Sequence, residues 1–144
     1  MSLHQALRNA LDREEFQLHC QPQVSTSSGA VIGVEALLRW QRPDHGEAFP
    51  GPFLPVLEET GLIVPVGTWV LRHACMAYRE LRNAGMPLPN IAVNVSAKQL
   101  QQVDFFDCVM SVISEAGIDA SALELEITES TFRNRVDRGH SLVR

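Results

Sequence analysis

The sequence predicts an α/β fold with a mostly parallel sheet, equivalent in size to about half of a β/α barrel. Short apolar runs alternate with segments of helical periodicity, which is the pattern of βαβ units. The 144 residues, 45% of them hydrophobic, suit one globular domain. The pattern allows an open doubly wound sheet or a barrel, and a complete barrel typically needs about 250 residues. Half of a barrel is therefore what the length can hold.

The N-terminal segment predicts a short amphipathic helix over residues 2–12. A serine that can cap the helix precedes leucines spaced four residues apart: Ser2, Leu3, Leu7 and Leu11. We interpret residues 1–15 as a lead-in or connector helix and residues 16–144 as the body of the domain.

Two β-like runs follow, at residues 16–24 (FQLHCQPQV) and 30–40 (AVIGVEALLRW). The Ser/Thr/Gly-rich loop between them is short enough for an antiparallel hairpin. Pro22 lacks a backbone donor, which disfavours a central position in the sheet for the first run.

The rest of the chain alternates helices and strands. A proline-rich loop over residues 41–55 leads into a short helix over residues 53–59, which Gly61 closes. The further expected elements are a helix over 66–81, a strand over 91–95, a helix over 106–116, a strand over 123–127 and a final helix from about residue 131.

Composition excludes several classes of function. The net charge of −5, without a Lys/Arg stripe, disfavours binding to nucleic-acid polymers. No run approaches the ~18 apolar residues of a membrane span, and the start lacks a secretory signal, so we expect a cytoplasmic protein. The three scattered cysteines suggest reduced, packed thiols rather than disulfides or a zinc site.

Polar side chains interrupt three strands that should be apolar on both faces. The two-residue period places Glu35 and Arg39 on one face of their strand, and Asn94 and Glu126 stand near the ends of theirs. Solvated edge strands or local pairs with arginine would explain any one of them. Together, carboxylate and amide oxygens at strand ends are suited to Mg²⁺ or Mn²⁺ and predict a metal-dependent phosphoryl site.

The ordered motifs resemble those of the EAL domain family, named for the residues that stand here as Glu35-Ala36-Leu37. The resemblance runs from Phe16 onward. It comprises the Gln21-Pro22 pair, GVEALLRW, EETGLI at 58–63, a GxWVL helix start at 67–71, AVNVSAKQL at 92–100 and LELEITES at 123–130.

The resemblance implies a barrel of EAL type with an antiparallel first strand, and metal-dependent hydrolysis of the bacterial second messenger cyclic di-GMP to the linear dinucleotide. Carried over by position, Glu35, Asn94 and Glu126 would be ligands of Mg²⁺ or Mn²⁺. Glu129 would orient a nearby active-site loop.

The same resemblance implies three contacts with the ligand. Gln21 and Arg39 would bind cyclic di-GMP, the arginine through its fork of donors to phosphate. Leu37 would pack near the guanine or ribose.

The family's Asp-Asp-Phe-Gly strand and its catalytic lysine follow the EITES motif, whereas the sequence given ends at Arg144. We therefore expect residues 16–144 to be the N-terminal portion of the domain and to be inactive alone. Two alternatives stay open, a non-catalytic cyclic di-GMP receptor and a structural fragment that self-associates through exposed barrel edges. The parent protein would carry a sensory or GGDEF-type domain upstream.

Overall fold

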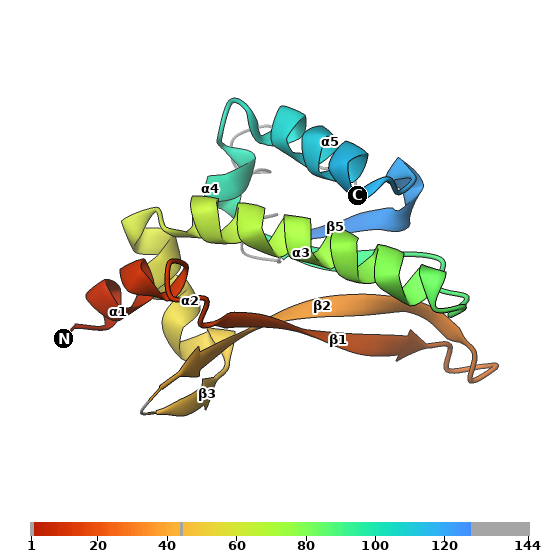
Figure 1. Cartoon of the computed structure of the whole chain (residues 1–144), viewed down its shortest axis with the longest axis horizontal. Coiled ribbons are helices and arrows are strands. Elements are labelled where there is room, and N and C mark those ends of the chain that lie inside the picture. The colour runs from red at the N-terminus through yellow and green to blue at the C-terminus, as the bar shows by residue number, and fades with distance from the viewer. Residues whose placement is uncertain (1, 44, 128–144) are drawn as a thin grey trace.

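The computed structural model describes residues 2–43 and 45–127 and has helices on one side of a mixed sheet (Figure 1). The strands follow the order β1-β2-β4-β5, and the short β3 pairs with β2. In chain order the elements are α1 (Leu3–Ala10), β1 (Phe16–Val24), β2 (Val31–Arg42), β3 (Gly46–Ala48), α2 (Pro50–Thr60), α3 (Ile63–Asn83), β4 (Ile91–Val95), α4 (Ala97–Leu100), α5 (Phe105–Ala116), a 3-10 turn (Ala120–Ala122) and β5 (Leu123–Ile127).

The predicted hairpin is confirmed. β1 runs antiparallel to β2 from the pair Phe16 and Trp40 to the pair Pro22 and Val34. Among the described strands β1 stands at the edge of the sheet. An edge strand tolerates Pro22, because its outer side needs no backbone N–H to pair with another strand.

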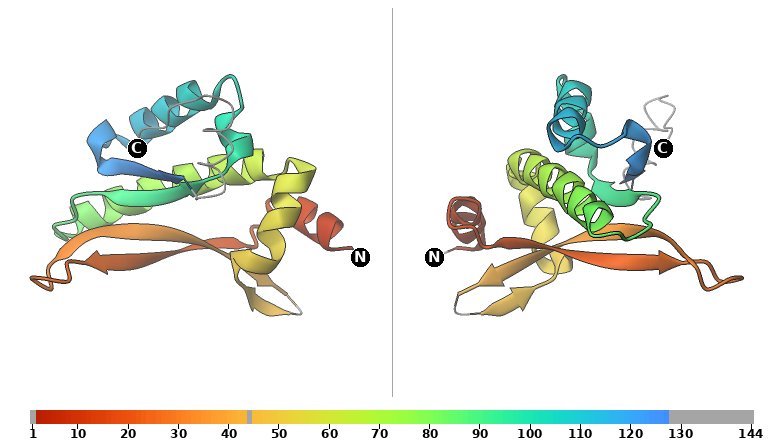
Figure 2. Two further views of the ribbon diagram at one scale, coloured as in Figure 1. Left: turned by 180° about the vertical axis from the view of Figure 1, so that it is seen from behind. Right: turned by 45° about the vertical axis from the view of Figure 1, so that its right-hand side comes forward.

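The parallel part of the fold is confirmed as well. β4 lies parallel to β2, and β5 lies parallel to β4 over its whole length. The connections between these strands carry helices, as parallel strands require. Figure 2 shows from behind that β4 and β5 extend the sheet beyond the hairpin. The arrangement agrees with the N-terminal half of a β/α barrel with an antiparallel first strand.

The capping and glycine signals in the sequence predict most helix ends to within a few residues of their position in the structure. Ser2 Oγ accepts a hydrogen bond from the backbone N–H of Gln5 at 3.2 Å and so caps α1. Gly61 and Gly117 end α2 and α5 in the left-handed conformation, with φ of 80° and 67°. The helix expected from residue 131 lies outside the described residues.

Two elements differ from the expectation for residues 41–55. β3 occupies part of the predicted loop, and α2 begins at Pro50 rather than at residue 53. Proline lacks an N–H that the first helical position would leave unbonded anyway, so Pro50 starts the helix instead of delaying it. A three-residue strand is too short to show the alternation by which strands are recognised.

An aromatic cluster fills the core where the hairpin meets α2 and α3. Trp40 is 1% exposed, and its ring lies 5.5 Å from that of Phe53 and 6.2 Å from that of Phe16. Trp40 Nε1 donates to Glu15 Oε1 at 3.0 Å, which satisfies its polar atom. Leu7 and Ala10 are buried too, so α1 packs on the rest of the fold.

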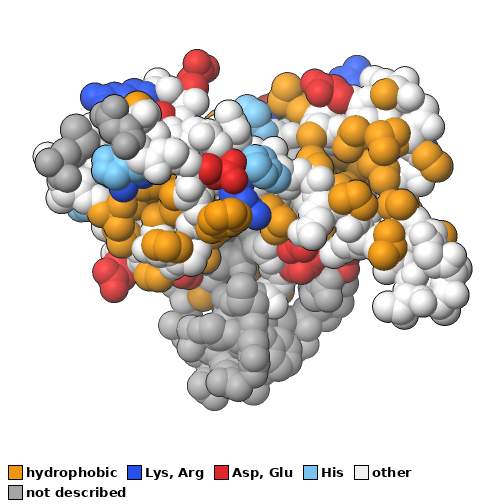
Figure 3. All heavy atoms as spheres, turned by 90° about the horizontal axis from the view of Figure 1, so that it is seen from below, with side chains coloured by type: hydrophobic (Ala, Val, Ile, Leu, Met, Phe, Trp, Pro, Cys, Tyr) orange, Lys and Arg blue, Asp and Glu red, His pale blue; other side chains and the backbone are white. Residues whose placement is uncertain are grey.

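Several large hydrophobic side chains are exposed at the far end of the hairpin. Val24, Val31, Ile32 and Met86 are each about half exposed. The view from below shows hydrophobic atoms gathered near the hairpin turn, on the right of Figure 3. In the described part of the chain no helix is long and apolar enough to span a membrane.

Candidate functional site

The sheet has one apolar face and one polar face, because side chains alternate along each strand. Val34, Ala36 and Val93 are buried in the hydrophobic core on the side of the helices. The intervening residues point to the opposite side. Those residues include nearly all of the site candidates from the sequence.

Strand register brings the candidates from three strands together on this polar face. Gln21 of β1 stands opposite Glu35 of β2, and Glu35 is in register with Ala92 of β4. Asn94, two residues beyond Ala92, is in register with Glu126 of β5. Residues in register on neighbouring strands share a face, so all four polar side chains lie on one surface.

Two of the three predicted metal ligands are in direct contact. Asn94 Nδ2 donates a hydrogen bond to Glu35 Oε2 at 3.2 Å. Asn94 is exposed, and Glu35 and Glu126 are half-buried. These oxygens are therefore reachable from solvent at the C-terminal end of the parallel strands.

The donor set fits a hard divalent cation. Two carboxylates and an amide offer oxygen ligands of the type that Mg²⁺ and Mn²⁺ prefer. A half turn of the Asn94 amide would exchange Nδ2 for Oδ1 and direct an oxygen to the space beside Glu35 Oε2. The described residues contain no cluster of three His, Cys, Asp or Glu side chains, so the candidate set is two carboxylates and one amide.

The predicted ligand-binding residues extend along the hairpin from the metal candidates. Leu37 pairs with His19, and Arg39 pairs with Gln17, on the same face as Glu35. Arg39 is half-buried, and its Nη1 donates to the carbonyl oxygen of Leu38 at 2.8 Å. Its guanidinium lies 4.6 Å from the centre of the Phe49 ring. Glu129, the expected loop-orienting acid, lies outside the described residues.

The structure adds His19 and Glu47 to this face. His19 Nε2 lies 3.2 Å from Glu47 Oε2, and Gln41 Nε2 donates to the same oxygen at 2.7 Å. His19 stands two residues before Gln21, so strand alternation alone was a signal for its position. No such signal pointed to Glu47, because residues 46–48 have the sequence pattern of a loop.

The C-terminal end of β4 is fixed by a capping box directly after Asn94. Gln99 Oε1 accepts from the backbone N–H of Ser96 at 3.0 Å, and Ser96 Oγ accepts from the N–H of Gln99 at 3.4 Å. Both side chains are buried. The Gln99 amide occupies the space where a Cβ on Gly67 would stand, so the glycine of the GxWVL segment makes room for this cap.

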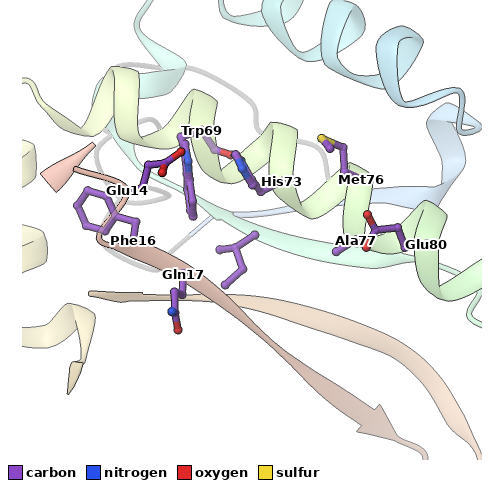
Figure 4. Close-up of a pocket in the computed structure, with 9 residues that line it drawn as sticks. Glu14, Phe16, Gln17, Trp69, His73, Met76, Ala77 and Glu80 are labelled. Atoms are coloured by element: carbon purple, nitrogen blue, oxygen red, sulfur yellow. The ribbon is translucent and has the colours of Figure 1, made fainter. Parts of the chain in front are cut away.

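An open groove on the other side of the sheet does not belong to this site. It has a volume of about 480 Å³ and lies between α3 and the start of β1, on the side of the sheet that carries the helices. Figure 4 shows Trp69, His73 and Glu80 along α3, whereas Gln17 extends to the other side of β1. Side chains of α3, several of them exposed, form one wall of the groove, and the predicted metal and ligand residues are not among those that line it.

Comparison with known proteins points to one family. The EAL domain model matches residues 4–142. The chain is 47% identical over 131 residues to the bifunctional diguanylate cyclase/cyclic di-GMP phosphodiesterase MucR of Pseudomonas aeruginosa, covering 91% of this chain and 19% of MucR. It is 36% identical over 138 residues to the cyclic di-GMP phosphodiesterase NbdA of the same organism, covering 96% of this chain and 18% of NbdA.

Solved structures have the same fold. The PaMucR phosphodiesterase in complex with c-di-GMP superposes with a TM-score of 0.89 at 45% identity, covering 96% of this chain and 56% of that chain. The sequence spans about a fifth of the length of MucR and NbdA.

Proposed function

Because the chain belongs to the EAL domain family, we propose that it is part of a metal-dependent phosphodiesterase that hydrolyses cyclic di-GMP to the linear dinucleotide. The observation that carries the proposal is the polar face of the sheet, where Glu35 and Asn94 are in contact and Glu126 is in register with Asn94. The likeness to MucR and NbdA supports cyclic di-GMP as the substrate.

In this proposal Glu35, Asn94 and Glu126 hold Mg²⁺ or Mn²⁺ through their side-chain oxygens. When bound, the metal would supply Lewis-acid activation of water and stabilisation of charge on the phosphodiester. Glu129 would orient a neighbouring loop, as expected from the family motif.

The hairpin would bind the nucleotide. Arg39 presents a planar fork of donors that suits a phosphate oxygen pair, and it stands on the same strand face as Glu35. By strand geometry the two Cα atoms are about 13 Å apart, a separation that leaves room for a ligand spanning from metal to guanidinium. Gln21 and Leu37 flank this path and would contact the nucleotide and its ribose.

We further propose that the 144-residue polypeptide is inactive by itself. The family's paired aspartates and catalytic lysine have no counterparts in it. The lysine would take part in activating water, and the aspartates would complete the second metal position. A polypeptide verified as 144 residues by intact mass should therefore release no linear dinucleotide above the rate without protein.

The phosphodiesterase proposal is tested on the protein that carries this sequence. Turnover of cyclic di-GMP, followed by chromatography, should require Mg²⁺ or Mn²⁺ and fall at least a hundredfold in Glu35→Gln. Glu115→Gln is the matched control, because Glu115 is an exposed acid on α5. Binding of cyclic di-GMP without turnover would contradict the enzyme and favour the receptor alternative, whereas neither binding nor turnover would contradict both.

Three expectations about context belong to the same proposal. The substrate is a second messenger, which favours a cytoplasmic location. A sensory or GGDEF-type domain upstream would control such an activity. Self-association through strand edges is the third, and its physical basis is the outer edge of β1, which no described strand covers.

A further inference from the structure

A short segment folds back beside the predicted ligand-binding arginine. After β2 the chain returns as β3, which pairs antiparallel to β2 with Gln41 opposite Glu47 and Trp40 opposite Ala48. We call residues Gly46 to Phe49 the β3 arm. Strand alternation places Glu47 and Phe49 on the same side as Arg39.

The β3 arm is attached to both strands of the hairpin through one carboxylate. Glu47 Oε2 accepts from Gln41 Nε2 of β2 at 2.7 Å and lies 3.2 Å from His19 Nε2 of β1. The same carboxylate oxygen thus contacts one side chain from β1 and one from β2. The position of the arm relative to the polar face is therefore set by side chains as well as by the β3 ladder.

The aromatic residue at the end of the β3 arm stacks on Arg39. The guanidinium carbon of Arg39 lies 4.6 Å from the centre of the Phe49 ring, within the range of a cation–π contact. The contact with the Leu38 carbonyl at 2.8 Å fixes Nη1, whereas buried Nε has no hydrogen-bond partner in the described residues. The ring and the carbonyl thus contact the guanidinium from two elements while its Nε is left without a partner in the part of the chain that the structure describes.

Neither the core nor the helix that follows accounts for a phenylalanine at this position. Phe49 is 57% exposed, so its ring contributes little to the packed interior. Phe49 is also the N-cap of α2 and makes no side-chain cap hydrogen bond. Serine, threonine, aspartate or asparagine would cap the helix better. A residue that breaks a local rule beside a candidate site suggests a role in that site.

We propose that Phe49 is a positioning residue, held in place by Glu47, that orients Arg39 toward a phosphate of the nucleotide. This inference rests on the proposed function, because it presupposes that Arg39 binds the ligand. Arginine has many rotamers, and a stacked, preoriented guanidinium loses less freedom when a phosphate binds. Phe49 therefore acts on affinity and not on the chemical step.

The test compares steady-state kinetics of substitutions at Phe49 in the protein that carries this sequence. Phe49→Ala should raise KM for cyclic di-GMP about two- to fivefold with kcat unchanged, the size of one exposed cation–π contact. Phe49→Tyr should restore the wild-type KM, because an aromatic face is kept. Phe106→Ala is the matched control, since it removes a phenylalanine that is 72% exposed on α5, and KM should stay unchanged.

Two further variants test the route through Arg39. In an Arg39→Ala background, Phe49→Ala should have no additional effect on KM, because no guanidinium is left to orient. Glu47→Gln should weaken the anchor on His19 and raise KM in the same direction as Phe49→Ala.

The outcomes separate the inference from the function. An active wild-type enzyme whose KM is the same in Phe49→Ala and Phe106→Ala overturns the role of Phe49 alone. A Phe49→Tyr variant as weak as Phe49→Ala also overturns it. A wild-type protein that neither binds nor hydrolyses cyclic di-GMP overturns both proposals, since Arg39 then has no phosphate to meet.

Discussion

At the scale of single residues, one hydrogen bond links two of the predicted metal ligands across the polar face. The hydrogen bond from Asn94 to Glu35 joins two strands across the face, and the amide is the neutral member of the set. A neutral ligand between two carboxylates limits the repulsion between like charges when no cation is bound. In the proposed function Asn94 would supply an oxygen to the metal, and without a metal its amide donates to Glu35.

Removing the Asn94 amide should weaken metal binding. We expect Asn94→Ala to raise the Mn²⁺ concentration needed for half-maximal turnover at least tenfold, because one of three oxygen ligands is lost. Titration of activity with Mn²⁺ measures this change. Asn83→Ala, an exposed position at the end of α3, serves as the control. An unchanged Mn²⁺ requirement would remove Asn94 from the metal site.

The cysteines differ in reactivity because they differ in burial. Cys75 is 0% exposed, and desolvation raises its pKa to about 11. Desolvation raises the pKa of Cys20 as well, but that side chain is exposed, contrary to the packed thiol that the sequence suggested. Iodoacetamide at pH 7.5 should thus modify Cys20 before Cys75, which should react only on unfolding.

Mass spectrometry of peptides after timed labelling checks this order. A raised thiol pKa keeps Cys75 in its neutral, unreactive form below about pH 11, and burial keeps the reagent away, so its labelling in the folded protein should be slow. Labelling of Cys75 at the rate of Cys20 in native protein would show that α3 is not packed as described.

At the scale of elements, a helix cap supports the end of a functional strand. Ser96 and Gln99 close the turn after β4, and the Gln99 side chain fits against α3 only because residue 67 lacks a Cβ. The glycine of the GxWVL segment and the glutamine of NVSAKQL are thus parts of one contact. Their shared role is mechanical, and it keeps Asn94 at the strand end.

Gly67→Ala should destabilise the protein through this contact. The added methyl group would displace Gln99 and leave a buried amide without its partner, at a cost of about 1–3 kcal/mol. Urea denaturation measures the change in unfolding free energy. Gly51→Ala is the control, because its new Cβ would meet nothing within 4 Å. Combining Gly67→Ala with Gln99→Ala should cost less than the sum of both, and strict additivity would contradict the contact.

At the scale of the whole molecule, exposed apolar surface and a free strand edge occur together. Val31 and Ile32 are about half exposed near the hairpin turn, and the outer edge of β1 has no neighbour among the described strands. Edges of this kind pair with other chains unless they are covered. Self-association of the 144-residue polypeptide follows as an expectation.

A charge on this patch should reduce self-association. Ile32→Lys places a cation on the patch, and we expect a lower mean mass in light scattering than for the unaltered polypeptide at equal concentration. Ser27→Lys adds the same charge in the exposed hairpin turn and serves as the control. An unaltered polypeptide that is a monodisperse monomer at high concentration would disprove the expectation.

Local pattern predicted most elements, and local pattern together with the resemblance to EAL domains identified the candidate residues. Two-residue alternation placed Glu35, Leu37 and Arg39 on one face, and glycine and serine signals located helix ends, because these rules act over neighbouring residues. The shortest elements were not predicted. β3 has three residues and α4 has four, too few for a period to be visible.

Only the tertiary structure decided which polar side chains meet. Asn94 contacts Glu35 across 59 residues of sequence, and Phe49 reaches Arg39 through the return of β3. Such contacts depend on strand register and on the fold of a loop, which arise from packing of the whole sheet against α3 and the aromatic cluster. The sequence by itself thus determined the family and its candidate ligands, and the three-dimensional register determined how they share one face and what holds Arg39 there.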